Sequence, residues 1–287
     1  MIYAPSTRLL SLWFNREERG RAIGTFFSGM NMATLAMVVT IPPLCIAIGW
    51  RFGFWFPGGL AIVGAVMAWF FLKEPPAIPG MEAQVGRKIT RQGLKSVLTN
   101  RQLWVLYVAG FFIIGRGIGT LTWALSYLVV VQHFNVTLAG LVMGLFALGE
   151  LIGAPTGGYL SDLARKRKYV VVTASLVFAM PFMIVLAYAP QISIPVAAVL
   201  FFVGGFTSNM AASIQPVVAE SAGPRLAGSA MGLANTIWQL GGATAPAVFG
   251  YLIDVTGGYT AGWIAMAVFA LLAAFSMALV NERPKTT

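Results

Sequence analysis

Eight long apolar runs dominate this sequence. An α-helix needs roughly 20 apolar residues to cross the hydrocarbon core of a bilayer, and we predict such spans at residues 22–48, 52–72, 102–131, 138–160, 169–189, 194–219, 226–253 and 260–280. Residues 1–14 have the composition of the end of a ninth span. Backbone groups in lipid must be hydrogen-bonded internally, and a barrel would show short alternating strands, so the predicted fold class is an all-α polytopic membrane protein.

Composition and charge support the same class. The chain is 58% hydrophobic and 10% charged, whereas a soluble domain carries about a quarter charged residues. Lys and Arg in short loops stay on the cytoplasmic side of a membrane. Every second gap is basic, and these gaps hold 16 of the 19 basic residues: Arg16, Arg19, Arg21, Lys73, Arg87, Lys88, Arg91, Lys95, Arg101, Arg165, Lys166, Arg167, Lys168, Arg225, Arg283 and Lys285. We therefore predict a cytoplasmic (inner) membrane protein with its C-terminus inside.

Several classes of function are disfavoured. The net charge of +10 is spread over five loops without an aromatic-interleaved patch, so nucleic acid is not an expected partner. Cys45 and His133 are the only cysteine and histidine. With one cysteine, the chain cannot form a disulfide framework or a cysteine metal site. Without a second histidine, it can form neither a two-histidine zinc site nor a serine or cysteine nucleophile site. We expect neither an enzyme nor a bound metal or cofactor.

A short pattern occurs twice along the chain. Residues 20–24 (GRAIG) enter one predicted span and residues 228–232 (GSAMG) enter another from the same side, 208 positions later. Parallel repeats of one orientation are separated by an even number of spans. We therefore predict two repeats of six spans, of which the second is complete and the first lacks on the order of 100 N-terminal residues.

This repeat predicts the organisation of the chain. Residues 1–72 are expected to be the remnant of an N-terminal six-helix half, with the end of its fourth helix and helices five and six, and residues 102–280 the complete C-terminal half. Residues 281–287 would be a cytoplasmic tail. Residues 73–101 would form a central cytoplasmic loop, either as an amphipathic helix along the membrane surface or as a solvated linker.

The segment after the fourth full span carries a family resemblance. It reads Gly158-Tyr-Leu-Ser-Asp162-Leu-Ala-Arg165-Lys166-Arg167, and it resembles the G-x-x-x-D-R-x-G-R-R loop of the major facilitator superfamily. Leu163 and Arg165 depart from that pattern. Residues 13–22 (WFNREERGRA), followed by the Pro42-Pro43 pair and residues 49–51 (GWR), are similar to the sugar-phosphate permease and anion:cation symporter branches.

The resemblance implies a fold and a mechanism. Members of the family have twelve helices in two six-helix halves, with a substrate path between the halves and transport by alternating access. By this resemblance the loop containing Gly158, Asp162, Arg165, Lys166 and Arg167 helps to lock the two halves during gating. Gly158 would in addition allow close approach of helices.

Arg116 is the charged residue most indicative of function. It lies about 14 residues into its span, which at 1.5 Å per residue is ~21 Å from the cytoplasmic start of the span and well inside a ~30 Å core. Ionisable side chains at such depth are costly and face a cavity or a partner. A guanidinium offers a fork of donors to a carboxylate or phosphate, and organophosphate antiporters of this family hold their anion with an arginine on the seventh helix. Alternatively, Arg116 pairs with an acid for packing alone.

Glu150 lies at a similar depth within a glycine-rich span. It is a candidate proton-coupling group, a candidate ion-pair partner of Arg116, or a group hydrogen-bonded to a neighbouring helix. The four-residue spacing of the surrounding glycines predicts one helix face for close packing, formed by Gly149, Gly153 and Gly157. Three further glycines around Arg116 predict bending or local unwinding there: Gly115, Gly117 and Gly119.

Polar side chains at mid-span complete the candidate substrate site. They are Asn31, Asn209, Gln215, Asn235 and Gln239, with Trp123 and Tyr127 one and two turns beyond Arg116. Asn31 and Gln239 share the 208-residue offset, which would place them on opposite walls of a cavity. For any one of them, hydrogen bonding between helices is an equal alternative to contact with substrate.

These observations predict a monomeric secondary active transporter for a small organic anion, a carboxylate or a phosphate ester, coupled to a proton or cation. The alternatives are a carrier or efflux pump for neutral or cationic solutes, and a non-transporting membrane sensor on the same fold. Since three helices of one cavity wall would be absent, the chain by itself is expected not to transport.

Overall fold

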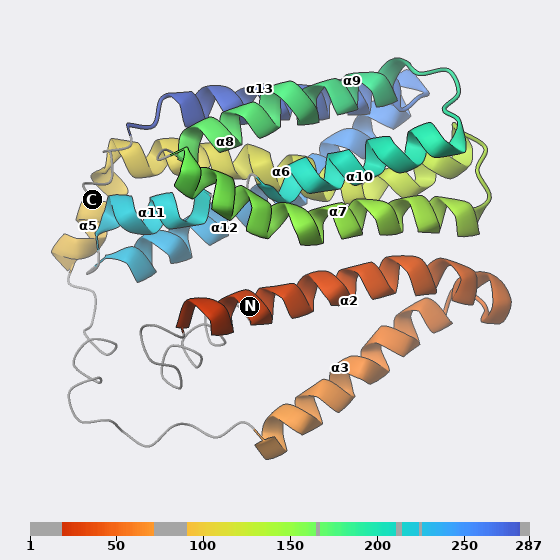
Figure 1. Cartoon of the computed structure of the whole chain (residues 1–287), viewed down its shortest axis with the longest axis horizontal. Helices are drawn as coiled ribbons and strands as arrows, with labels where there is room; N and C mark the ends of the chain where they lie inside the picture. Colours follow the sequence, from red (N-terminus) through yellow and green to blue (C-terminus); the bar gives the residue numbers. More distant parts are fainter. Residues whose placement is uncertain (1–18, 72–90, 165–166, 211–213, 224–225, 282–287) are drawn as a thin grey trace. The chain divides into compact units, whose positions relative to one another are not determined.

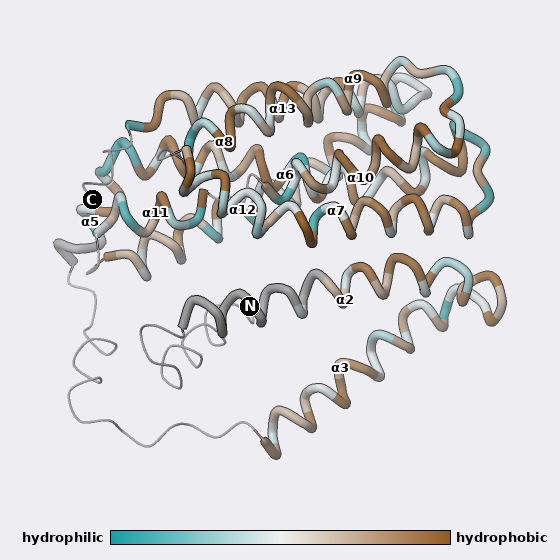
Figure 2. Tube along the Cα trace, viewed as in Figure 1, coloured by the Kyte–Doolittle hydropathy of each residue, from teal (hydrophilic) through white to brown (hydrophobic). Residues whose placement is uncertain are grey.

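The computed structural model describes residues 19–71, 91–164, 167–210, 214–223 and 226–281 (Figure 1). Within them all regular structure is helical and no strand occurs, which confirms the all-α prediction. Six segments are long and apolar enough to cross a membrane, and their hydropathy can be followed in Figure 2: Phe52–Phe71, Arg101–Val130, Val136–Ser161, Lys168–Tyr188, Ile194–Ala222 and Thr260–Ala278. The chain divides into two compact units, residues 1–89 and 90–287.

The first unit contains two helices joined by a tight turn. α2 spans Arg19–Ile48 and α3 spans Phe52–Phe71. Gly49 follows α2 with φ of 107°, a left-handed conformation that glycine adopts without steric cost. Close packing of the hairpin involves Gly53, where an added Cβ would lie 2.7 Å from Sγ of Cys45.

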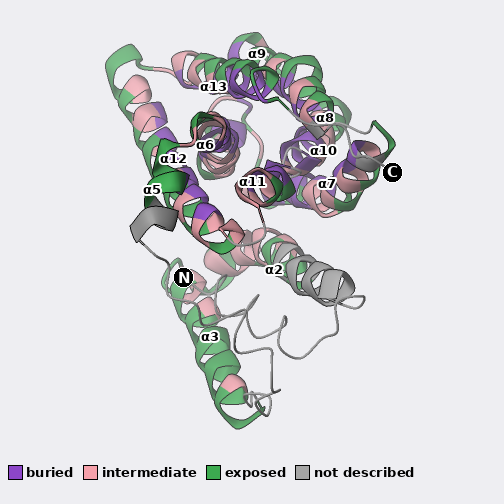
Figure 3. Ribbon diagram, turned by 90° about the vertical axis from the view of Figure 1, so that its left-hand side faces the viewer, coloured by how far each residue is buried: buried purple, intermediate pink, exposed green. Residues whose placement is uncertain are grey.

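The second unit is a helical bundle. Its helices are α5 (Arg91–Thr99), α6 (Arg101–Val130), α7 (Val136–Leu163), α8 (Arg167–Thr173), η1 (Ala174–Ala179), α9 (Met180–Tyr188), α10 (Ile194–Met210), α11 (Ile214–Ala222), α12 (Ala227–Thr256) and α13 (Thr260–Ala278). α6 packs along α12 and α13, and α7 packs along α10, while α13 also contacts the α8–η1–α9 rod. Figure 3 looks along most of these helices and shows their buried positions in purple.

Glycines set the close pairing of α7 with α10. A Cβ on Gly149 would meet the backbone of Phe202, and one on Gly153 would meet the carbonyl of Phe206. Gly157 continues this face against Met210. The predicted packing face is therefore confirmed. Gly158 does not belong to it, because nothing among the described residues lies within 4 Å of an added Cβ there, and the expectation of close approach at Gly158 is wrong within this unit.

The expected unwinding around Arg116 does not occur. α6 is one α-helix from Arg101 to Val130. Its glycines instead allow side-by-side packing: a Cβ on Gly115 would lie 2.9 Å from the carbonyl oxygen of Gly241 on α12, and one on Gly119 would lie 2.7 Å from Sδ of Met266 on α13. Contacts with neighbouring helices offset the low intrinsic helix propensity of glycine.

An irregular turn occurs where η1 joins α8 to α9. η1 is π-helical, and the N–H of Met180 donates to the carbonyl of Ser175 five residues earlier. Pro181 follows directly at the start of α9. A proline has no N–H for an α-helical bond and its ring clashes with the carbonyl four residues before it. The wider π turn accommodates this proline within an otherwise continuous rod.

The structure extends the sequence repeat. α2 (Arg19–Ile48) ends 208 positions before the end of α12 (Ala227–Thr256). Gly49 and Gly257, at the same offset, follow the two helices with φ of 107° and 73°. α3 and α13 begin at Phe52 and Thr260, again 208 positions apart.

Part of the predicted central loop is helical. α5 buries Val97, which is 1% exposed, in the core of the second unit. Residues 72–90 of the loop lie outside the described residues. Arg91–Thr99 is therefore helical, and the position of this helix along the membrane surface stays a prediction.

Candidate functional site

Arg116 is buried at the middle of α6 and is 1% exposed. Its Nε and Nη2 atoms have no hydrogen-bond partner among the described residues. These two nitrogens lie on one edge of the planar guanidinium, where their N–H bonds run parallel and can hold two oxygens of one anionic group. A buried charge with free donors is costly unless something pairs with it.

Glu150 on α7 is the acidic residue that interacts electrostatically with Arg116, and the carboxylate and the guanidinium attract each other. Nε and Nη2 of Arg116 are nevertheless not hydrogen-bonded to Glu150. Asn209 on α10 donates from Nδ2 to the backbone carbonyl oxygen of Glu150 at 3.0 Å. Of the two uses predicted for Asn209, the structure shows the hydrogen bond between helices.

Sequence analysis did not select three buried polar residues on α6 and α10, one of which is hydrogen-bonded to the backbone of Arg116. Thr120 donates from Oγ1 to the carbonyl of Arg116 at 2.8 Å, and its Oγ1 lies 3.9 Å from Sδ of Met183. Ser208 on α10 faces α6 at Gly117, where an added Cβ would lie 3.4 Å from its Oγ. Thr207 is buried beside it. The run of three polar residues at 207–209 (TSN) within an apolar span could have indicated Thr207 and Ser208 from the sequence.

Trp123 and Tyr127 belong to an aromatic cluster that joins α6 to α12 and α13. Trp123 stacks on Phe249 at 5.6 Å and 11°, and its Nε1 donates to the carbonyl of Pro246 at 2.9 Å. Tyr127 packs edge-on against Trp263 at 5.3 Å. Its hydroxyl accepts a 2.8 Å hydrogen bond from Nε2 of Gln132. The polar atoms of both predicted substrate contacts are thus engaged within the bundle.

The other predicted polar residues lie in different settings. Asn235 and Gln239 are exposed on α12, and Gln215 is half-buried on α11. The side chain of Asn31, on α2, is outside the described residues, and Asn31 and Gln239 belong to different units. The expected arrangement of Asn31 opposite Gln239 therefore stays a prediction.

The predicted gating loop is only partly described. Gly158 is half-buried near the end of α7, and its carbonyl accepts a 2.7 Å hydrogen bond from Oγ of Ser161. The side chain of Asp162, and Arg165 and Lys166 as a whole, lie outside the described residues, as does the side chain of Arg167 at the start of α8. Among the described residues, no group of three or more His, Cys, Asp or Glu side chains could hold a metal ion.

Comparison with known proteins decides the family. The model of the Major Facilitator Superfamily matches residues 1–149 and 117–287. The chain belongs to the major facilitator superfamily. This membership confirms the family that the sequence motifs indicated, and with the apolar helices it makes the chain a multi-pass membrane protein of a transporter family.

Relatives of this major facilitator protein are named as transporters of small organic anions. It is 25% identical to a probable galactarate/D-glucarate transporter of Escherichia coli, over 96% of this chain and 68% of the relative. It is 26% identical to a probable hexose phosphate transport protein of Chlamydia muridarum, over 94% and 66%, and 29% identical to a probable sulfoacetate transporter of Cupriavidus necator, over 90% and 64%. The chain thus spans about two thirds of the length of these relatives.

A solved structure shows the same fold. The bacterial homologue of the human lysosomal transporter Spinster, in an inward-facing and unoccupied conformation, aligns with a TM-score of 0.68 at 17% identity. The alignment covers 96% of this major facilitator chain and 73% of the other.

Proposed function

We propose that this protein is a secondary active transporter of a small organic anion, and that Arg116 binds the anionic group. The observation that carries the proposal is a fully buried guanidinium whose Nε and Nη2 donors both lack a partner among the described residues. Two parallel donors fit two oxygens on one centre, as in a carboxylate, a phosphate ester or a sulfonate. The names of the relatives, for glucarate, hexose phosphate and sulfoacetate, support the same class of substrate.

Glu150 is the proposed proton-coupling group. Its charge attracts the guanidinium of Arg116 without occupying the Nε and Nη2 donors. When the carboxylate is ionised it competes with an incoming anion for the positive charge, and when it is protonated it does not. Binding of the anion is thereby linked to uptake of a proton.

The remaining elements of the proposal concern the path. Asn235 and Gln239 would contact the substrate from α12, because exposed polar amides are unfavourable against lipid and suit a polar cavity. Trp123 and Tyr127 would shape the outer end of the site through packing. We propose alternating access of two six-helix halves, with residues 1–72 belonging to the first half and 102–280 to the second. The C-terminus would lie on the cytoplasmic side of the inner membrane.

Equilibrium binding tests the site directly. Purified protein in lipid nanodiscs would be titrated with radiolabelled D-glucarate, glucose 6-phosphate and sulfoacetate. We expect binding of at least one of them to weaken about tenfold or more in Arg116→Lys and Arg116→Gln, since a bidentate charge-assisted pair contributes about 1.5–3 kcal/mol. Lysine keeps the charge but loses the fork.

The matched control is Arg51→Gln, an exposed arginine in the turn between α2 and α3. It should bind each anion as the parent does. Unchanged binding in both Arg116 variants would remove Arg116 from the site. Binding of an organic cation that is abolished by Glu150→Gln would instead favour the alternative of a cation carrier.

A further inference from the structure

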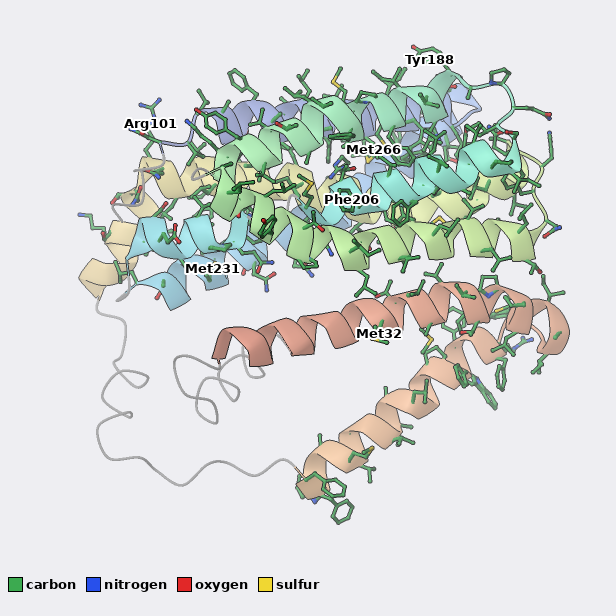
Figure 4. All side chains as sticks on the ribbon, viewed as in Figure 1. Met32, Arg101, Tyr188, Phe206, Met231 and Met266 are labelled. Atoms are coloured by element: carbon green, nitrogen blue, oxygen red, sulfur yellow. The ribbon has the colours of Figure 1, made fainter. Side chains whose placement is uncertain are left out.

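A basic and partly apolar surface lies where α5 meets α6, away from the buried anion site. The α5–α6 corner consists of Lys95, Leu98, Arg101 and Trp104. Lys95 and Arg101 are exposed, and Leu98 and Trp104 are 44% and 43% exposed. Figure 4 labels Arg101 at this end of the second unit.

The helical geometry of α5 separates an inner from an outer face. Val97 is buried, whereas Lys95, two positions earlier, is about 200° away around the helix axis and points outward. Leu98 lies about 60° from Lys95, so a cation and an exposed apolar side chain share the outer face. A basic helix with apolar side chains on its exposed face is typical of segments that lie in the membrane interface.

Hydrogen bonds fix the corner in place. Oδ1 of Asn100 caps α6 by accepting from the N–H groups of Gln102 at 3.0 Å and Leu103 at 3.4 Å. Nε2 of Gln102 donates to Oγ of Ser221 at 3.2 Å and to the carbonyl of Asn281 at 3.0 Å. These bonds attach the first turn of α6 to the ends of α11 and α13, so the corner is held by the bundle.

The indole of Trp104 connects the two helices of the corner. Its Nε1 donates to the carbonyl of Leu98 at 2.7 Å, which satisfies a carbonyl at the end of α5. The ring also packs edge-on against Tyr107 at 5.7 Å. Lys95 and Arg101 therefore lie on either side of a short, braced turn.

The length of α6 places this turn at the lipid headgroups. Its 30 residues make a helix about 45 Å long, against a hydrocarbon core of about 30 Å. Roughly 7 Å, or about one turn and a half, then extends beyond the core at each end. Trp104, in the first turn, is at the level where tryptophans form interfacial belts.

We propose that the α5–α6 corner binds the phosphate groups of anionic phospholipids. Lys95 and Arg101 supply positive charge at headgroup level, Leu98 and Trp104 contact the upper acyl region, and the hydrogen bonds hold this arrangement before lipid arrives. Each basic residue near an anionic membrane contributes about 1 kcal/mol, about fivefold in affinity. The site is independent of Arg116 and of the proposed transport.

Native mass spectrometry of the detergent-solubilised protein tests this assignment. The protein would be titrated with phosphatidylglycerol and, separately, with phosphatidylcholine. We expect phosphatidylglycerol to bind more tightly, and the double variant Lys95→Gln/Arg101→Gln to lose up to about thirtyfold in that affinity. Phosphatidylcholine binding should stay as in the parent.

Two control variants test whether the loss of lipid binding comes from the lost charge at this corner, and not from misfolding or from the loss of any exposed basic residue. The charge-preserving variant Lys95→Arg/Arg101→Lys should retain phosphatidylglycerol binding, and Arg51→Gln, which removes an exposed arginine from the other unit, should also retain it. Equal affinity of the parent for the two lipids would overturn the proposal. So would unchanged phosphatidylglycerol binding in the glutamine double variant, an equal loss in Arg51→Gln, or displacement of the lipid by soluble glycerol phosphate.

Discussion

Asn209 on α10 donates a 3.0 Å hydrogen bond from Nδ2 to the backbone carbonyl oxygen of Glu150 on α7. The bond attaches the backbone of the proposed coupling residue to the neighbouring helix, while the Glu150 carboxylate interacts with the charge of Arg116. Helices α6, α7 and α10 thus each contribute at least one polar residue to an otherwise apolar bundle.

Removing this bond should have a modest effect on stability. We expect Asn209→Leu to lower the free energy of unfolding by about 0.6 kcal/mol, and at most about 1.7 kcal/mol, the range found for hydrogen bonds between membrane helices. Thermal unfolding in detergent would measure it. Asn235→Leu, an exposed amide on α12, is the control and should leave stability as it is.

Substitutions of two glycines five residues apart on α7 should have opposite effects on stability. Gly153→Ala should destabilise by about 1–3 kcal/mol, because its Cβ would meet the carbonyl of Phe206 on α10. Gly158→Ala should be neutral or stabilise by up to about 1 kcal/mol, since nothing described lies within 4 Å and alanine is the better helix former. Denaturant unfolding monitored by circular dichroism compares the two. Equal costs would show that packing of α7 on α10 is not what requires glycine.

Anion binding should depend on pH through Glu150. As pH falls and the carboxylate becomes neutral, it no longer competes for the charge of Arg116, so binding should strengthen. Glu150→Gln is permanently neutral and should bind the anion tightly with a flat pH profile. Sulfoacetate binding between pH 6 and 8 is a suitable measurement, because the sulfonate stays ionised over this range. A parent profile identical to that of Glu150→Gln would contradict the coupling role.

Gln132 should matter more to stability than Tyr127 at the outer end of α6. Nε2 of Gln132 donates to the hydroxyl of Tyr127 at 2.8 Å, and its Oε1 accepts from the N–H of Ile192 at 2.7 Å. Gln132→Leu leaves the buried N–H of Ile192 and the hydroxyl of Tyr127 without their partners and should cost about 1–3 kcal/mol. Tyr127→Phe removes only the acceptor of Gln132 Nε2, which also lies 3.5 Å from the carbonyl of Ala189, and should cost less. Thermal shift assays distinguish these outcomes. Val130, an exposed residue near the end of α6, changed to Ala, provides the control.

The repeat and the positions of the helices could be predicted because they depend on local sequence. An apolar run of membrane length is a property of one segment, and each predicted span coincides with a helix or with consecutive helices. Glycines at four-residue spacing indicated the α7 packing face for the same reason. The unwinding predicted from the glycines around Arg116 was wrong, because their low helix propensity is offset by contacts with α12 and α13, which local sequence does not reveal, while the alternative of bending stays a prediction.

By itself, the sequence determined the class of protein, the positions of the helices and the presence of Arg116 and Glu150 within them. Only the tertiary structure decided which helices pair, that Trp123 and Tyr127 use their polar atoms inside the bundle, and that Nε and Nη2 of Arg116 stay unpaired. The physical reason is that lipid tails and a bundle interior are equally apolar. Hydropathy therefore marks where a helix crosses, but not which of its faces meets another helix.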